Sequence, residues 1–148
     1  MTYTLYYSPG SCSLAPHIVL QELGLPFTLK LVSTSDGATR SPAHLRLNPK
    51  GRVPVLTFGE AVLTEAPAIL LHLALADPGQ TLLPFAPDGL VRCVEWFNWL
   101  SGTVHSGAAA VGSACGRAAA SPVARNTGMR LLVLAGVTDF NAHHVDQA

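Results

Sequence analysis

Residues Tyr6–His17 are YYSPGSCSLAPH, and this stretch decides how the N-terminal part of the chain folds. A strand pattern ends at Pro9-Gly10, which favours a turn, and Cys12 follows where we expect a helix to begin. A thiol at a helix N-terminus lies beside unpaired N–H groups and the positive end of the helix dipole, which favours its thiolate. Because thiolates are the reactive form in disulfide exchange, the stretch predicts thiol chemistry at Cys12.

The elements around this stretch follow the order β-α-β and then β-β-α. The expected strands are 4–7, 27–31, 53–58 and 61–63, and the expected helices are 12–23, a short one after Pro42, and 64–76 with Thr64 as N-cap. The two later strands meet at Gly59-Glu60 with the spacing of a tight antiparallel hairpin. Parallel and antiparallel strands then share one sheet, which predicts an α/β fold of the thioredoxin-like kind over residues 1–80.

A proline-containing linker, 81–87, leads into a partial helical domain over residues 88–148. The first helix of this domain is expected over 88–106, with apolar residues at helical spacing. Asn98 and His105 are seven residues apart and fall on a second, polar face of that helix. The helical pattern weakens from Gly107 onward, and a last helix is expected over 123–145.

Composition excludes several classes of protein. Hydrophobic residues make up 49% of the 148 residues, charged residues 12%, and the net charge is zero, without a basic block, so we expect no nucleic-acid partner. The sequence has no leader pattern and no apolar run long enough to span a bilayer, so no membrane partner is expected. Its three cysteines form no C-x-x-C pair, which argues against a disulfide scaffold or a structural zinc site and predicts a cytoplasmic protein.

Three blocks carry a resemblance to a known family. They are YYSPGSCSLAPHIVLQE (6–22), NPKGRVPVLTFGEAVLTEAPAI (48–69) and VEWFNWLSGTVH (94–105). Over roughly its first 107 residues the chain resembles the bacterial beta-class glutathione transferases. The resemblance implies an N-terminal thioredoxin-like domain, an all-α C-terminal domain that is incomplete here, glutathione as co-substrate, no metal, and a homodimer.

The resemblance also implies roles for individual residues in binding glutathione. A cis bond before Pro54 turns the backbone of Val53 toward the ligand, where its N–H and C=O pair with the cysteinyl part like an added strand. Glu65 meets the γ-glutamyl amine, and the helix N-terminus at Ala66 meets the γ-glutamyl carboxylate.

The catalytic residues implied by the resemblance are Cys12 and His105. Cys12 forms a mixed disulfide with glutathione, while Asn98 and His105 reach its sulfur and the bound peptide. A histidine there stabilises a thiolate or relays a proton near neutral pH.

Each of these residues also has a purely structural interpretation. Cys12 can be a small buried apolar side chain, His105 a solvated residue, Glu65 an acid favourably placed at a helix N-terminus, and Pro54 an ordinary edge-strand proline. We favour the ligand-binding interpretation because each residue has its expected place in the fold. The other histidines, His44 among them, lack partners at metal-ligand spacing, so we expect solvated or locally hydrogen-bonded rings and no metal site.

The chain departs from the family pattern at several positions. Ala66 stands where relatives usually have Ser or Gly, Ser106 stands where they usually have Lys, and the loop 33–40 lacks a lysine that helps to bind the glycine carboxylate. The chain stops at Ala148, before further helices that the resemblance implies, as a truncation, a frameshift or a real variant. We therefore expect weaker glutathione binding and slower turnover than in the family.

The sequence leads to one main hypothesis and two alternatives. The main hypothesis is a glutathione transferase that conjugates the glutathione thiolate to small electrophiles and can form a mixed disulfide at Cys12. The alternatives are a glutathione-dependent thiol-disulfide reductase, in which Cys12 is essential, and a degenerate, non-catalytic glutathione-binding or interaction domain.

Overall fold

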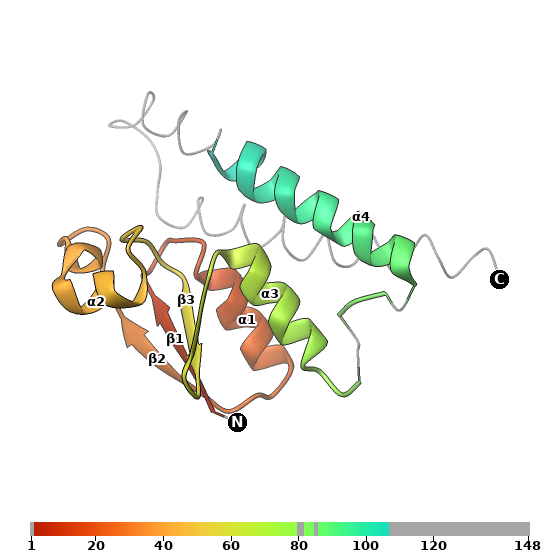
Figure 1. Ribbon diagram of the computed structural model, residues 1–148, viewed down its shortest axis with the longest axis horizontal. Helices are drawn as coiled ribbons and strands as arrows, with labels where there is room; N and C mark the ends of the chain where they lie inside the picture. Colours follow the sequence, from red (N-terminus) through yellow and green to blue (C-terminus); the bar gives the residue numbers. More distant parts are fainter. Residues whose placement is uncertain (1, 80–81, 85, 107–148) are drawn as a thin grey trace. The chain divides into compact units, whose positions relative to one another are not determined.

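Residues 2–79, 82–84 and 86–106 are described by the computed structural model of the chain (Figure 1), which falls into two units, Met1–Thr81 and Leu82–Ala148. The helix predicted over 123–145 lies outside the described residues. No helix among the residues described is long and apolar enough to cross a membrane.

The first unit is built on a four-stranded sheet with the strand order β2-β1-β3-β4. The strands are β1 (Tyr3–Tyr7), β2 (Phe27–Leu31), β3 (Val55–Phe58) and β4 (Ala61–Thr64). β1 and β2 are parallel and are joined through α1 (Leu14–Glu22), while β1–β3 and β3–β4 are antiparallel. This mixed sheet confirms the predicted thioredoxin-like α/β fold.

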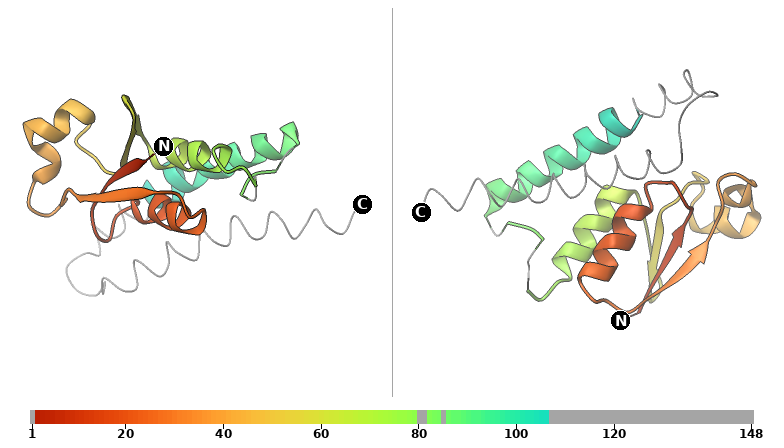
Figure 2. Two further views of the ribbon diagram at one scale, coloured as in Figure 1. Left: turned by 90° about the horizontal axis from the view of Figure 1, so that it is seen from below. Right: turned by 180° about the vertical axis from the view of Figure 1, so that it is seen from behind.

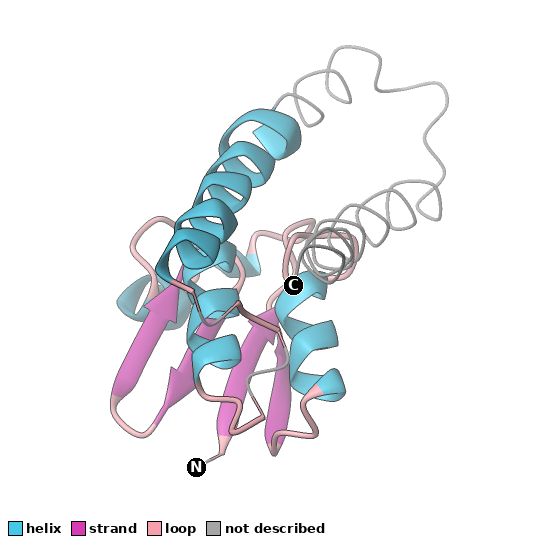
Figure 3. Ribbon diagram, turned by 90° about the vertical axis from the view of Figure 1, so that its right-hand side faces the viewer, coloured by secondary structure: helices cyan, strands magenta, loops and turns pink. Residues whose placement is uncertain are grey.

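One face of the sheet carries the core of this unit. Alternate residues of β1, Tyr3 and Leu5, point to this face and are buried with Leu56 of β3. Two helices supply the other side of the core: Leu20 comes from α1, and Ile69 and Leu73 come from α3 (Ala66–Leu75). α1 and α3 lie side by side against this face (Figures 2 and 3).

The opposite face carries the short helix α2 (Pro42–Leu47), preceded by the 3₁₀ turn η1 (Ala38–Arg40). Ser41 caps α2, because its hydroxyl accepts a hydrogen bond from the His44 N–H at 3.3 Å. Tyr6 points away from the core on this side, and its ring lies 6.2 Å from that of His44. α2 therefore places His44 beside the ends of the central strands.

Two helices begin later than the sequence pattern predicts. α1 begins at Leu14 with Ser13 as N-cap. The Ser13 hydroxyl donates to the Ser8 carbonyl at 3.1 Å and accepts from the Ser8 N–H at 3.2 Å, and these two bonds hold residues 8–13 as a loop. Cys12 thus lies before the helix. The N-cap of α3 is Glu65 instead of Thr64, since Thr64 still pairs with Val55 in the hairpin.

The second unit contains α4 (Pro87–Asn98), which continues into the π-helix η2 (Trp99–His105). The Ser101 hydroxyl donates to the Phe97 carbonyl at 2.7 Å where the helix widens. A π-helix turns through less angle per residue than an α-helix, because its hydrogen bonds run from i to i+5. The prediction that Asn98 and His105 share one face assumed α-helical spacing, which η2 does not keep, so the shared face stays a prediction.

Candidate ligand-binding site

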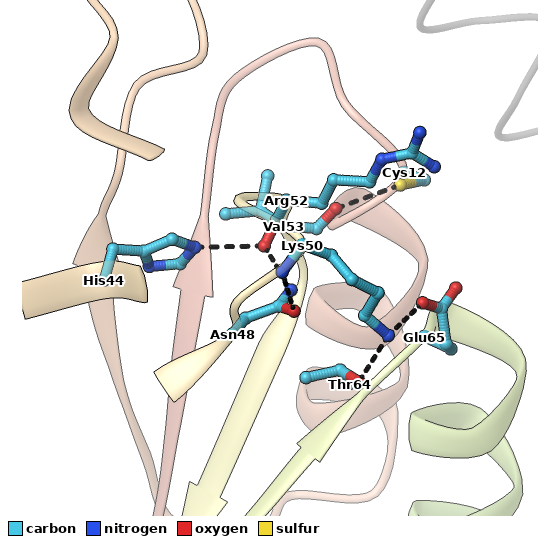
Figure 4. Close-up of polar contacts among 8 residues, drawn as sticks. All are labelled: Cys12, His44, Asn48, Lys50, Arg52, Val53, Thr64 and Glu65. Carbon is cyan, nitrogen blue, oxygen red and sulfur yellow. Dashed lines mark hydrogen bonds and ion pairs between the residues drawn. The ribbon is translucent and has the colours of Figure 1, made fainter. Parts of the chain in front are cut away.

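Cys12 lies in the loop before α1, and its thiol donates a hydrogen bond to the Val53 carbonyl over 3.5 Å (Figure 4). Burial raises the pKa of this thiol above its ordinary value of 9.0, and the negative charge of Glu65 raises it further. A hydrogen bond from its own backbone and the positive charge of Arg52 act against the rise but do not cancel it. The predicted stabilisation of the thiolate is thus wrong for the free protein, where Cys12 is a thiol at neutral pH.

A tight turn, Asn48-Pro49-Lys50-Gly51, leads toward Val53. The Gly51 N–H donates to the Asn48 carbonyl at 2.9 Å and closes the turn. Gly51 has φ +62°, and a Cβ at this position would lie 3.1 Å from the Arg40 side chain. Its positive φ therefore favours glycine at this position, and a Cβ would in addition require a small shift of the Arg40 side chain.

Two side chains hold the backbone just before Val53. The Arg52 carbonyl accepts hydrogen bonds from Asn48 Nδ2 at 2.9 Å and from His44 Nε2 at 3.0 Å (Figure 4). Asn48 also accepts the Lys50 N–H through Oδ1 at 3.2 Å, so one buried amide fixes both ends of the turn. A carbonyl can only accept, so the His44 proton lies on Nε2.

His44 and Asn48 were not among the residues that we expected from the sequence to shape the site. His44 is locally hydrogen-bonded, as one of the two sequence interpretations had it, but it is also buried, with only 4% of its surface exposed. Two polar residues at i and i+4 directly before a Pro-x-Gly turn form the sequence pattern by which the pair can be recognised.

Val53 follows this held carbonyl, and its peptide bond to Pro54 is cis. Its carbonyl accepts the Cys12 thiol, and its N–H has no hydrogen-bond partner among the residues that the structure describes. Backbone groups of this kind, next to the start of β3, can pair with an extended peptide.

Glu65 has an unusual backbone. It is the one non-glycine residue with positive φ in the described part of the chain, with φ 72° and ψ 120°. Such a conformation costs about 1–3 kcal/mol and is found preferentially at ligand sites. The Glu65 carboxylate pairs with the Lys50 ammonium, which also donates to Thr64 Oγ1 at 2.9 Å (Figure 4).

The N-terminus of α3 directly follows Glu65 and has no side-chain cap. Within the described residues, the N–H groups of Ala66 and Ala68 have no hydrogen-bond partner, and Pro67 between them has no N–H. Unpaired N–H groups at a helix N-terminus attract an anion such as a carboxylate. The contact needs only a backbone N–H, so an alanine at position 66 is compatible with it.

The first unit thus brings together Cys12, Val53, Glu65 and Ala66, which were predicted from three separate parts of the sequence. Asn98 and His105 lie in the second unit, at the end of α4 and the end of η2, and both are exposed. A search of the described residues finds no group of three or more His, Cys, Asp or Glu side chains able to hold a metal ion.

The geometry of the first unit offers three kinds of contact to a ligand. A carboxylate at Glu65 suits an ammonium group, and the N–H groups that follow it suit a carboxylate, so the two together suit the end of an α-amino acid. Val53 offers backbone groups to a peptide, and Cys12 places a thiol beside them. A small peptide with a free amino-acid end and a sulfur atom matches all three.

Comparison with known proteins points to one family. Residues 1–75 match the family model described as glutathione S-transferase, N-terminal domain. Glutathione S-transferase GstA of Escherichia coli O157:H7 is 38% identical over 106 residues, which cover 70% of this chain and 53% of that protein. Glutathione S-transferase GST-4.5 of Xanthomonas campestris pv. campestris is 42% identical over 106 residues, which cover 68% and 49%. The chain spans about half the length of these curated relatives.

Solved structures agree with the sequence comparison. A glutathione transferase homolog from Sulfitobacter with bound glutathione superposes with a TM-score of 0.70 and 28% identity, covering 99% of this chain and 72% of that one. A glutathione S-transferase from Xylella fastidiosa gives a TM-score of 0.67 and 28% identity, covering 95% and 69%.

Proposed function

Because the chain belongs to the glutathione S-transferase family through its N-terminal domain, we propose that it binds glutathione and transfers its thiolate to small electrophiles. The match covers only about half the length of the relatives that carry this name, so the activity itself is the proposal. Glutathione is a small peptide with a free amino-acid end and a thiol, which are the groups that the site suits.

The observation that carries this proposal is the strained N-cap of α3. Glu65 holds φ 72° directly before a helix N-terminus whose Ala66 N–H is unpaired within the described residues. The γ-glutamyl end of glutathione carries an ammonium and a carboxylate on one carbon. The Glu65 carboxylate binds the ammonium and the Ala66 N–H binds the carboxylate, so two adjacent residues supply the two groups that one amino-acid end needs.

The cysteinyl part of glutathione then lies along Val53. The Val53 N–H and carbonyl pair with it as an added strand would, which brings the ligand sulfur toward Cys12, whose Sγ lies 3.5 Å from the same carbonyl. We extend the proposal to Asn98 and His105, which bind the peptide and assist the sulfur. In this proposal the imidazole of His105 is the base that accepts the thiol proton.

The proposed reaction is a nucleophilic attack. The bound thiol gives up its proton, and the resulting thiolate forms a C–S bond with an electrophilic carbon while the leaving group departs with its bonding electron pair. Since Ser106 supplies no cation, thiolate stabilisation falls to His105 and the hydrogen bonds of the site.

A second candidate function is thiol-disulfide exchange, which the place of Cys12 beside Val53 favours. In that reaction the Cys12 thiolate attacks glutathione disulfide, forms a protein–glutathione mixed disulfide, and releases one glutathione as thiolate. The Cys12 proton goes to solvent or to the released thiolate, and no other oxidant is needed. A binding domain without catalysis is the third candidate.

Calorimetric titration with glutathione, followed by conjugation of a chlorodinitrobenzene, tests the transferase proposal. We expect binding by the wild type, loss of most of the affinity in Glu65→Gln, and measurable conjugation. Cys12→Ala separates the candidates, because conjugation then continues in part while disulfide exchange stops. Binding without either reaction leaves the non-catalytic domain, and no binding refutes all three.

Intact mass after incubation with glutathione disulfide supplies an independent readout for Cys12. We expect one glutathionyl adduct that a reductant removes and that Cys12→Ala abolishes. An adduct that persists in Cys12→Ala belongs to Cys93 or Cys115 and refutes the role of Cys12 in exchange.

A further inference from the structure

In the free protein Lys50 is paired with the Glu65 carboxylate, which is the group proposed to bind the ligand ammonium. Its ammonium pairs with Glu65 and donates to Thr64 Oγ1 at 2.9 Å (Figure 4). The ammonium group of a lysine and the α-ammonium group of a peptide are the same kind of donor, with the same charge and three N–H groups. Lys50 is paired with Oε1 of Glu65, so a ligand ammonium that uses this oxygen must take its place, and one that uses Oε2 meets the positive charge of Lys50.

The position of Lys50 is set by the turn. Its N–H is bonded to the buried Asn48 side chain at 3.2 Å, and Gly51 closes the turn directly after it. Thr64 and Glu65 lie across the β3–β4 hairpin, in which Val55 pairs with Thr64. The turn thus keeps one cation within reach of Glu65 in the free protein.

The pair is also easy to break. The side chains of Lys50 and Glu65 are 49% and 63% exposed, and ion pairs in such surroundings contribute little because water and salt screen them. The flexible lysine side chain can swing into solvent without disturbing the buried Asn48 below it.

We propose that Lys50 is an internal competitor for the ligand ammonium: it neutralises Glu65 in the free protein and is displaced when glutathione binds. This inference rests on the proposed role of Glu65 in binding the γ-glutamyl amine. It makes Lys50 a residue that determines affinity for ligands with a free amine, without itself touching the ligand.

Two ligands and two variants test the inference. Glutathione carries the amine, and glutaryl-cysteinyl-glycine is the same peptide without it. Lys50→Met removes the competitor. Lys30→Met is the matched control, because Lys30 is the chain's other lysine; it lies on β2, with its ammonium over the ring of Tyr6 on β1. Dissociation constants are measured by calorimetry for both ligands with the wild type and both variants.

Lys50→Met is expected to lower the dissociation constant of glutathione about two- to fivefold more than that of the amine-free peptide. This factor corresponds to the free energy of an exposed ion pair. Lys30→Met is expected to change both ligands by the same factor. Taking the ratio between ligands removes the general effect of a lost positive charge on anionic peptides.

An equal effect of Lys50→Met on both ligands overturns the inference and leaves the proposed function standing. A loss of glutathione affinity in Lys50→Met that exceeds the loss for the amine-free peptide also overturns it, because Lys50 would then assist the amine-bearing ligand. Failure of the wild type and of Lys50→Met to bind glutathione at all refutes the proposed function and this inference together.

Discussion

Cys12 shows how one residue depends on its surroundings at the scale of single atoms. Its thiol is half-buried, and desolvation outweighs the groups that favour the thiolate, so its pKa lies above 9.0. A raised pKa means that the folded protein keeps the proton longer than the unfolded chain does. Cys12 therefore contributes stability that is fully present below the unfolded pKa and is lost as the pH rises through the folded pKa.

The first prediction concerns the rate at which iodoacetamide alkylates Cys12. We expect the rate to rise with pH with a midpoint above 9.0, because only the thiolate reacts. Glu65→Gln removes a negative charge and lowers the pKa, so alkylation at pH 8 becomes faster. Arg52→Gln removes a positive charge and makes it slower. Peptide mapping by mass spectrometry separates Cys12 from the other cysteines.

Cys93 is the internal control for this experiment. Burial alone raises the pKa of its thiol, so neither variant is expected to change its alkylation rate. If Glu65→Gln and Arg52→Gln move the Cys12 rate in the same direction, the electrostatic account of Cys12 is wrong.

The second prediction concerns the backbone of Glu65. Glycine at φ 72° relieves strain of about 1–3 kcal/mol, while its greater loss of backbone entropy costs about 0.5–1 kcal/mol. Relief therefore wins, and we expect Glu65→Gly to be about 1 kcal/mol more stable than Glu65→Gln in urea unfolding. Both variants lose the exposed pair with Lys50, so this loss cancels in the comparison.

The matched control is Glu60, an exposed residue of the β3–β4 turn whose φ is not positive. Glu60→Gly is expected to be less stable than Glu60→Gln, because it has the entropy cost without relief of strain. The same order at both positions would contradict the claim that Glu65 is strained.

At the scale of elements, the turn from Asn48 to Val53 depends on α2. His44 and Asn48 both donate to the Arg52 carbonyl, so the helix end holds the backbone that leads into Val53. The Arg52 carbonyl keeps one donor when the other is lost, so each of these hydrogen bonds contributes about 0.5–1.5 kcal/mol. The glutathione affinity proposed for Val53 is therefore expected to depend on a residue that lies on another element.

The third prediction compares two substitutions of His44. His44→Leu removes one of the two donors to the Arg52 carbonyl, and we expect a loss of stability of about 0.5–1.5 kcal/mol and a rise in the dissociation constant of glutathione. His44→Gln retains a side-chain N–H and is expected to restore both in part. Urea unfolding and calorimetry measure the two effects. If His44→Leu changes stability and leaves the glutathione dissociation constant unaltered, His44 serves the fold alone.

The comparison of sequence and structure is clearest at this scale. The short apolar run 4–7 and the Pro9-Gly10 break predict β1 and its turn, because these signals are local in the sequence. Lys50 and Glu65 are 15 residues apart, and only the register of the β3–β4 hairpin brings them together. The raised pKa of Cys12 likewise comes from packing, which a strand-turn-helix pattern does not contain.

The π-helix η2 was not predicted from the sequence, for a different reason. Trp99–His105 has the polar and apolar residues of an ordinary helix end, so its pattern predicts α-helical turns. The signal in the sequence is weak: the Ser101 hydroxyl bonds to the Phe97 carbonyl, and Gly102 follows it without a side chain. Helix type at this point is decided by such local bonds and not by hydrophobic spacing.

At the scale of the whole molecule, the residues proposed to bind glutathione fall in both units. Cys12, Val53, Glu65 and Ala66 belong to Met1–Thr81, whereas Asn98 and His105 belong to Leu82–Ala148. The domain limits predicted from the sequence, with a linker over 81–87, remain a proposal. A contribution of the second unit to binding can be measured through the stabilisation of the folded protein by bound glutathione.

The fourth prediction uses this linkage. A ligand at a hundred times its dissociation constant stabilises the folded state by about 2.7 kcal/mol. At the glutathione concentration that gives this effect in the wild type, we expect smaller stabilisation of Asn98→Ala and His105→Ala in thermal unfolding. Ser106→Ala, next to His105, is the control and is expected to match the wild type. Equal stabilisation of all four proteins would show that the first unit binds glutathione alone.

The turn before Val53 also has a consequence for protein engineering. Its two exposed positions with charged side chains, Lys50 and Arg52, lie between the buried positions Asn48, Gly51 and Val53. A library that randomises the two exposed positions samples new charges beside Glu65 and Cys12, while the buried amide and the glycine keep the scaffold constant. Selection from such a library can change which small peptides the protein accepts without a search for a new fold.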